Sequence, residues 1–350
     1  FRGVFMSTTA FAASIALAIV LWRGGVITRD GVILIGTLSV FMNYAQGMME
    51  PVQWLVQVMS SLVNVQVNVE RVTRLLETES DVSDTPEVTA KYGDAFHPKK
   101  ENWEPLYGDI EFQDVTFRYP DGSENVLEHF NLKVPQGTNV AIVGETGAGK
   151  STLVNLVCRF FEPTQGRILI DGRDARERSQ LWLHSNIGYV LQTPHLFSGT
   201  VLENLRYGRP DATMDEIEAA VKAVSADQII ARLPDGYNTD IGEGGNTLST
   251  GEKQLLSFAR ALLADPRIFV LDEATSSVDT VTEQLIQNAI EKVMTGRTSF
   301  IIAHPLSTIR RADVILVVHD GKIIESGTHR SLMSARGAYY RLCSRQYREE

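Results

Sequence analysis

A little before its midpoint the chain reads Gly144-Glu145-Thr146-Gly147-Ala148-Gly149-Lys150-Ser151. This octapeptide matches the phosphate-binding pattern G-x-x-x-x-G-K-[ST] at every fixed position. The apolar run 140–143 precedes it, and a helix-like stretch, 151–161, follows it. Glycines let successive backbone N–H groups point inward at an anion, and the following helix adds the positive end of its dipole. The sequence therefore predicts a strand, a loop and a helix that bind a nucleoside triphosphate, and this context disfavours a chance Gly-rich turn.

The side chains beside the loop have separate expected roles. Lys150 is expected to reach the β- and γ-phosphates, and the Ser151 hydroxyl to ligate Mg²⁺. A second apolar run, 268–271, ends in Asp272 and Glu273. A buried parallel strand would bring these two carboxylates beside the phosphates. Asp272 is then expected to bind Mg²⁺ directly or through water, and Glu273 to orient and polarise the attacking water.

Composition and charge limit the class of protein. The chain has 350 residues, room for about two domains, and its long apolar runs lie almost entirely near the beginning. The net charge of −10 argues against nucleic acid as the main partner, because such proteins usually carry a basic face. Cys158 and Cys343 have no metal-ligand or redox spacing, so we expect a reducing compartment and no disulfide. Cys158 is most simply a small core residue.

The beginning of the chain is apolar enough to cross a membrane. Residues Val4 to Trp22 carry no charge and reach roughly 28 Å as a helix, close to the thickness of the hydrocarbon core. A polar Gly-rich segment, Arg23 to Gly31, is expected to reverse the chain, and a second apolar run extends from Val32 to Met49. A buried hairpin in a soluble core is the alternative, but two consecutive runs of this length favour membrane spans.

The second run is expected to continue as a long helix outside the membrane. From Pro51 to about Glu77 the pattern is helical and amphipathic, and Pro51 is expected to kink it. Its polar members could line a substrate path or pack between helices, and both interpretations remain open; these are Asn43, Gln46 and Gln53. Residue 1 is Phe without a signal peptide pattern, so we expect a cut through a longer protein. We therefore assign 1–77 to membrane helices with a cytosolic extension, 78–107 to a linker and 108–350 to a catalytic domain.

A third motif lies between the first two. Residues Asn246 to Gln254 read NTLSTGEKQ and precede a helix-like run, 255–264. This segment resembles the L-S-G-G-Q signature of the ATP-binding cassette (ABC) superfamily, which other phosphate-loop ATPases lack. The resemblance implies that Tyr119 stacks on adenine, that Gln192 senses Mg²⁺ and couples to the membrane domain, and that His304 contacts the γ-phosphate. The loop 276–279, with Asp279, resembles the one that crosses the dimer interface, and 239–243 resembles the segment that touches the partner's cytosolic helices.

Together these motifs define the expected site. The expected catalytic residues are Glu273, His304 and Gln192, and the expected Mg²⁺ ligands are Ser151, Gln192 and Asp272. The expected nucleotide contacts are Tyr119, Gly144, Glu145, Thr146, Gly147, Ala148, Gly149, Lys150, Ser151, Thr152, Ser249, Thr250, Gly251, Glu252 and Asp279.

Three positions depart from the family pattern. Thr250 replaces the first glycine of the signature pair, Glu252 replaces its glutamine, and Pro305 follows His304 where the family usually has a basic residue. A Cβ at Thr250 is expected to hold the backbone away from the γ-phosphate of the opposite subunit, and Glu252 to place a negative charge near another one. The chain's own phosphate site is thus complete by sequence, whereas the signature that it offers a partner is weakened.

The resemblance implies a multidomain protein. Its fold class is an all-α transmembrane segment of two long helices followed by an α/β ATPase domain, with an antiparallel β subdomain and a helical subdomain. The implied function is that of an ATP-hydrolysing half-transporter of the bacterial exporter type in the inner (cytoplasmic) membrane, with its ATPase domain in the cytosol. ATP, Mg²⁺, membrane lipid and an unidentified transported substrate are the expected ligands, and no nucleic acid is expected.

Two other activities and two kinds of dimer partner are compatible with parts of this pattern. An importer built on the exporter fold remains open, whereas a soluble ABC ATPase acting on nucleic acid or ribosomes is disfavoured by the apolar spans. The intact phosphate site and the deviant signature favour a heterodimer with a second ABC half-transporter, and a homodimer that tolerates Thr250 is the alternative.

Overall fold

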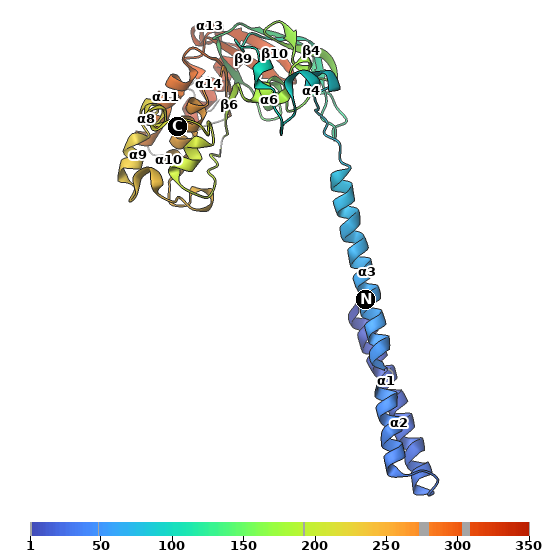
Figure 1. Cartoon of the computed structure of the whole chain (residues 1–350). Helices are drawn as coiled ribbons and strands as arrows, with labels where there is room; N and C mark the ends of the chain where they lie inside the picture. The colour runs from blue at the N-terminus through green and yellow to red at the C-terminus, as the bar shows by residue number, and fades with distance from the viewer. Residues whose placement is uncertain (1, 48, 192, 273–279, 303–308, 350) are drawn as a thin grey trace. The chain divides into compact units, whose positions relative to one another are not determined.

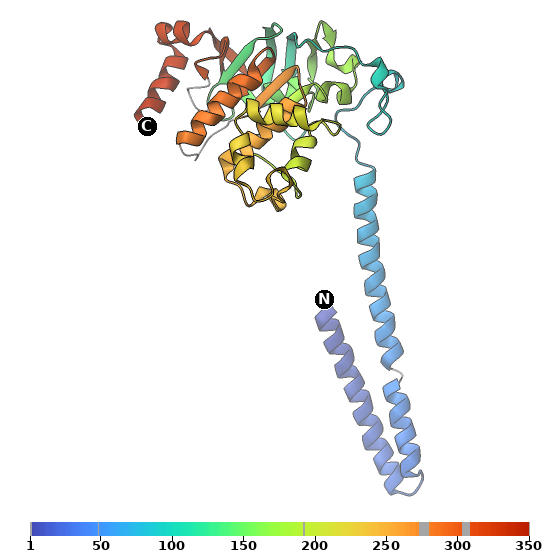
Figure 2. The same cartoon turned by 60° about the vertical axis from the view of Figure 1, so that its left-hand side comes forward.

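The computed structural model describes residues 2–47, 49–191, 193–272, 280–302 and 309–349. The chain divides into two compact units, Phe1–Ser80 and Asp81–Glu350. Figures 1 and 2 show helices alone in the first unit, and sheets covered by helices in the second. Each unit is described by itself.

The first unit consists of α1 (Arg2–Arg29), α2 (Ile35–Gly47) and α3 (Met49–Leu76), with α1 and α2 side by side (Figure 2). The reversal falls only at the end of the expected segment, Arg23 to Gly31, because α1 continues through Gly24 and Gly25 to Arg29. A Cβ on Gly24 would lie 2.2 Å from Leu38 Cδ1, so this glycine serves close helix packing. The reversal comes at Gly31, whose φ of 74° favours glycine.

The two expected spans are described to different extents, because the second includes Met48. Among the described residues one helical segment, Ala10–Arg29, is long and apolar enough to cross a membrane by length and composition. Within the second expected run, Val32 to Met49, the structure describes α2 and Met49, where α3 begins, whereas Met48 lies outside the described residues. Pro51, which was expected to kink the helix, lies within α3, described from Met49 to Leu76.

The second unit is built on two sheets. The six-stranded sheet has the order β10-β9-β3-β8-β7-β6, in which β9, β3, β8, β7 and β6 run parallel and β10 is antiparallel. The four-stranded antiparallel sheet has the order β2-β1-β4-β5. The strands are β1 (Ile110–Phe117), β2 (Leu127–Val134), β3 (Asn139–Val143), β4 (Gln165–Ile170), β5 (Arg173–Asp174), β6 (Ile187–Val190), β7 (Ile268–Asp272), β8 (Thr298–Ile302), β9 (Val314–His319) and β10 (Lys322–Gly327).

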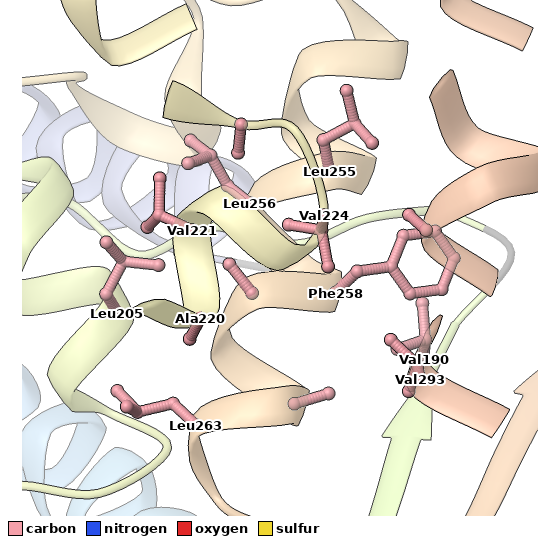
Figure 3. Close-up of a cluster of buried hydrophobic side chains, with 14 of the residues drawn as sticks. Val190, Leu205, Ala220, Val221, Val224, Leu255, Leu256, Phe258, Leu263 and Val293 are labelled. Atoms are coloured by element: carbon pink, nitrogen blue, oxygen red, sulfur yellow. The ribbon is translucent and has the colours of Figure 1, made fainter. Parts of the chain in front are cut away.

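Helices complete this unit. They are α4 (Pro86–Tyr92), α5 (Lys150–Val157), α6 (Gln180–His184), α7 (Val201–Arg206), α8 (Met214–Ala223), α9 (Asp227–Arg232), α10 (Thr250–Leu263), α11 (Thr280–Met294), α13 (His329–Ala335) and α14 (Ala338–Glu349). The α/β domain with an antiparallel β part and a helical part is confirmed. In the helical part α10 places Leu255, Leu256 and Phe258 in one core with Val221 and Val293 (Figure 3).

The segment expected to be a linker, 78–107, differs from that expectation. Most of it belongs to the second unit, which begins at Asp81, and Tyr92 and Leu106 are buried there. The Trp182 indole also donates to the Glu104 carbonyl at 2.8 Å. Buried residues at irregular spacing leave no apolar period in the sequence, which is why the pattern did not indicate this packing.

Replacing Phe258 by Ala should lower the free energy of unfolding of the second unit by about 3–5 kcal/mol, because a fully buried ring leaves a cavity. Met214→Ala, at an exposed helix position, is the control and should change it by less than about 0.5 kcal/mol. Pulse proteolysis across a urea series measures both. Equal losses in the two variants would contradict this description of the core.

Candidate functional site

The phosphate loop and Asp272 lie at one edge of the parallel sheet. β3 leads into the loop and β7 ends at Asp272, and both strands pair with β8. Ile142 and Asp272 have the same partner in the register, Ile302. Two strand spacings, about 10 Å, therefore separate the loop strand from the acidic strand. This is the edge at which parallel sheets bind ligands.

The loop requires glycine for space and for backbone conformation. A Cβ on Gly144 would lie 2.2 Å from the Val318 carbonyl oxygen, so no side chain fits there. Gly149 precedes α5 with φ 100°, a left-handed conformation that L-residues rarely adopt. The backbone can thus curl tightly and direct its amides toward the start of α5.

Lys150 is the first residue of α5, and its ammonium group lies over the loop. Its Nζ donates to the carbonyl oxygens of Gly144 and Glu145, both at 2.9 Å. A phosphate at the loop would offer this lysine charged acceptors in place of neutral carbonyls, and charge-assisted hydrogen bonds are the stronger ones. Ser151 beside it is exposed, as a hydroxyl ligand of Mg²⁺ must be.

Tyr119 lies next to the helix that follows the loop. Its hydroxyl oxygen is 2.9 Å from Thr152 Oγ1, and its ring meets Phe117 and Phe161 edge-on, with centroids 4.9 and 5.1 Å away. The half-buried ring is therefore held beside the loop by two aromatic neighbours and one hydrogen bond.

Tyr189 is a site residue that the sequence pattern did not indicate. It lies on β6, and its hydroxyl oxygen is 3.5 Å from Asp272 Oδ2. Burial, with the nearby charge of Asp272, raises the pKa of the Tyr189 phenol. The phenol therefore remains a donor toward the carboxylate at neutral pH. A tyrosine three residues before Gln192 carries no recognised pattern, so only the strand pairing identifies it.

The signature residues begin α10, in the helical part. Ser249 is the N-cap residue, its Oγ accepts from the Glu252 N–H at 3.3 Å, and Glu252 Oε2 accepts from the Ser249 N–H at 2.9 Å. This reciprocal pair is a capping box, readable as S-x-x-E. Arg232, on α9, donates to Glu252 Oε1 at 3.1 Å. The Glu252 carboxylate therefore accepts from the N-cap residue of its own helix and from the guanidinium of Arg232.

The two other signature positions differ in exposure. Thr250 is exposed, and Gly251 is buried. The side chain that departs from the family pattern thus lies on the outside of the helix start, where a partner could meet it.

Four expected site residues lie outside the described residues: Gln192, Glu273, Asp279 and His304. Their neighbours Asp272 and Ile302 end adjacent parallel strands. Cys158, by contrast, is described, and it is a core residue as expected, since it is fully buried and burial raises the pKa of its thiol to about 12.

The described donors fit a magnesium ion held mainly by phosphate. In the ranges given above for the structure, no group of three or more His, Cys, Asp and Glu side chains could hold a metal by itself. Mg²⁺ is commonly bound by one or two protein oxygens together with phosphate oxygens and water. One exposed hydroxyl, Ser151, and one carboxylate, Asp272, at the same sheet edge meet that requirement.

Replacing Tyr119 by Ala should weaken ATP binding about tenfold, since stacking of an aromatic ring on a base contributes about 1–3 kcal/mol. Tyr119→Phe is the matched variant. It keeps the ring and loses only the contact with Thr152, so it should bind ATP as the wild type does. Titration with a fluorescent ATP analogue measures both. Equal weakening in the two variants would show that the hydroxyl, and not the ring, is responsible.

The comparisons with known proteins agree with this geometry. Residues 127–276 match the ABC transporter family. The chain is 43% identical over 93% of its length to the uncharacterized ABC transporter ATP-binding protein YfiC of Bacillus subtilis, and covers 52% of it. It is 44% identical over 97% of its length to the fatty acid ABC transporter ATP-binding/permease protein of Mycobacterium tuberculosis, again covering 52%.

Two further similarities point the same way. The chain is 42% identical over 95% of its length to the ATP-dependent lipid A-core flippase of Desulfotalea psychrophila, and covers 55% of it. The structure is similar to that of a bacterial Atm1-family ABC exporter with ATP bound, with a TM-score of 0.71, 35% identity and coverage of 97% of this chain and 56% of that one. The chain thus spans about half the length of these relatives. It carries the ATP-binding domain of the ABC transporter family.

Proposed function

We propose that this chain is the ATP-hydrolysing part of an exporter-type ABC half-transporter in the cytoplasmic membrane. One observation carries the proposal: the phosphate loop and Asp272 flank the same strand at one edge of a parallel sheet. The same chain has a helix, Ala10–Arg29, that is long and apolar enough for a membrane. The names of two relatives support this assignment, since one is an ATP-binding/permease protein and the other an ATP-dependent flippase.

In this proposal the residues around the loop divide the work of hydrolysis. The loop amides and Lys150 hold the phosphates, while Ser151 and Asp272 supply oxygens for Mg²⁺, which neutralises charge on the β- and γ-phosphates when bound. Tyr189 donates to Asp272 and holds that carboxylate in place. Glu273 orients the attacking water, and His304 contacts the γ-phosphate. Gln192 senses Mg²⁺ and couples the site to the membrane domain. These three roles rest on the sequence alone.

The second half of each ATP site comes from a partner subunit. Two ATP-binding domains associate head to tail, and Ser249 at the start of α10 faces the nucleotide held by the other subunit. The positive end of the α10 dipole favours an anion there. Closure around ATP and reopening after hydrolysis then switch the membrane helices between two access states for a substrate that remains unidentified.

The partner is proposed to be a different half-transporter. The exposed Thr250 stands where the family has glycine, and Glu252 stands where it has glutamine, so this chain offers a deviant signature. A partner with a Gly-Gly signature would complete the site that contains Lys150 and Asp272. The site completed by Thr250 would then be the slower of the two.

Glu273→Gln should lower ATP turnover by about 10²-fold or more while ATP binding persists, because general-base assistance contributes about 10²–10⁴-fold. Lys150→Ala should instead weaken ATP binding itself. Steady-state hydrolysis and ATP titration of the intact transporter distinguish the two variants. If Glu273→Gln kept most of the hydrolysis, Glu273 would not be the residue that positions water.

The intact subunit should need a second half-transporter for full ATPase activity. Thr250→Gly should change turnover less than disabling the partner's signature does, because the site completed by Thr250 is the slower one. The measurement is ATPase activity after expression alone and together with a second half-transporter that carries a Gly-Gly signature. A stable dimer of this subunit alone, with full activity, would show that the partner is a second copy.

A further inference from the structure

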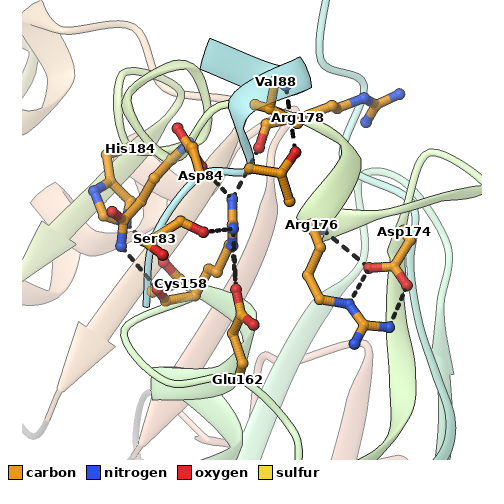
Figure 4. A network of polar contacts seen from close by, with 12 residues as sticks. Ser83, Asp84, Val88, Cys158, Glu162, Asp174, Arg176, Arg178 and His184 are labelled. Atoms are coloured by element: carbon orange, nitrogen blue, oxygen red, sulfur yellow. Dashed lines mark hydrogen bonds and ion pairs between the residues drawn. The ribbon is translucent and has the colours of Figure 1, made fainter. Parts of the chain in front are cut away.

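A buried arginine at the end of the phosphate-loop helix holds the chain that follows the membrane helices. Arg159 comes two residues after α5, and its side chain is only 3% exposed. Its Nη1 donates to Asp84 Oδ1 at 2.8 Å, and its Nη2 to the Ser83 carbonyl at 3.3 Å (Figure 4). Both acceptors lie in the segment 78–107, which was expected to be a linker.

The remaining contacts of Arg159 are with Glu162 and with the backbone carbonyl of Arg178. Nε and Nη2 donate to Glu162 Oε1 at 3.1 and 3.0 Å, and Nη1 donates to the Arg178 carbonyl at 2.8 Å. The guanidinium therefore faces two carboxylates. Glu162 belongs to the loop after α5, and Asp84 belongs to the segment that follows α3, here called the entering segment. Loss of Asp84 alone would leave the buried cation paired with Glu162.

Asp84 also connects the segment to a second element. Both of its carboxylate oxygens accept from the N–H of Gln180, the first residue of α6, at 3.1 Å. The Gln180 side chain donates in turn to the Arg159 carbonyl at 3.1 Å. α6 is followed by β6, which carries Tyr189 and leads to residue 192. The Asp84 carboxylate thus contacts both Arg159, just after α5, and the first residue of α6. α6 precedes β6, the strand whose Tyr189 contacts Asp272.

Few residues separate Asp84 from the end of α3, and few separate Arg159 from Lys150. Asp84 follows Leu76, the last residue of α3, by eight positions, a reach of at most about 28 Å. α5 is 8 residues long, about 12 Å, and its first residue is Lys150. A buried ion pair contributes little net stability compared with apolar packing. Here it holds residues 83 and 84 against the end of the phosphate-loop helix.

The rest of the segment has its own anchor. Glu104 accepts from Arg178 Nε at 3.1 Å and its backbone carbonyl accepts from Trp182. Residues near 104 would therefore stay in place without Asp84, and only the stretch next to α3 would be released.

We propose that Asp84 and Arg159 are positioning residues that couple the ATP site to the membrane helices, by fixing the chain after α3 to the end of the phosphate-loop helix. This proposal rests on the proposed transporter function. Nucleotide binding at the loop moves α5 and α6 together, and the carboxylate of Asp84 passes that movement to the end of α3.

The test is hydrogen–deuterium exchange of peptides covering 72–84 in the intact transporter, without nucleotide and with ATP and vanadate. In the wild type, nucleotide should change protection of these peptides about fivefold or more, in the range of typical coupling energies. In Asp84→Asn that response should disappear, while ATP hydrolysis without added substrate persists. Asp84→Ser serves as a second variant, with the same expectation.

Glu162→Gln is the matched control, because it removes one charge from the same guanidinium without touching the entering segment. It should keep the nucleotide response. A normal response in Asp84→Asn, or loss of the response in Glu162→Gln as well, would overturn the proposal. Absence of ATP hydrolysis in the wild type would instead refute the transporter function, and this proposal with it.

Discussion

The site depends on how closely the phosphate loop approaches the sheet. Gly144 has no room for a side chain against the Val318 carbonyl, and Gly149 has a backbone conformation that favours glycine. These two constraints place the loop amides and Lys150 at the carboxyl edge of β3. The register across β8 then places Asp272 at the same edge. Backbone geometry therefore places the groups expected to bind phosphate and Mg²⁺ at one edge of the sheet, independently of contacts between their side chains.

The unpaired backbone N–H groups at a helix start explain how α10 accommodates the deviant signature. The first turn of α10 has unpaired backbone N–H groups, and the pair Ser249 and Glu252 satisfies two of them. Glutamate at 252 is thus compatible with a well-formed helix start, and Arg232 balances its charge. Within this subunit the charge of Glu252 thus faces Arg232, whereas Thr250 is the exposed departure from the family pattern.

Local patterns predicted much of the fold and of the site. The phosphate loop, the acid-ended strand and the amphipathic helix α3 follow from short-range periodicity and fixed spacing, which is why they could be placed by sequence. Tyr189 and Arg159 could not, because their roles arise from partners about eighty residues away in sequence. The reversal comes later than the glycine-rich pattern indicated, since α1 continues through Gly24, which packs closely against Leu38, and through Gly25.

The central claim is that the backbone amides of residues 144–151 hold the phosphates of ATP. The most direct test is an NMR spectrum of the ¹⁵N-glycine-labelled chain before and after addition of ATP and Mg²⁺, with the loop signals assigned by single glycine replacements. The amide protons of Gly147 and Gly149 should move strongly downfield, because charged phosphate oxygens become their hydrogen-bond acceptors. Unchanged loop signals, while glycines elsewhere in the chain respond, would contradict the account.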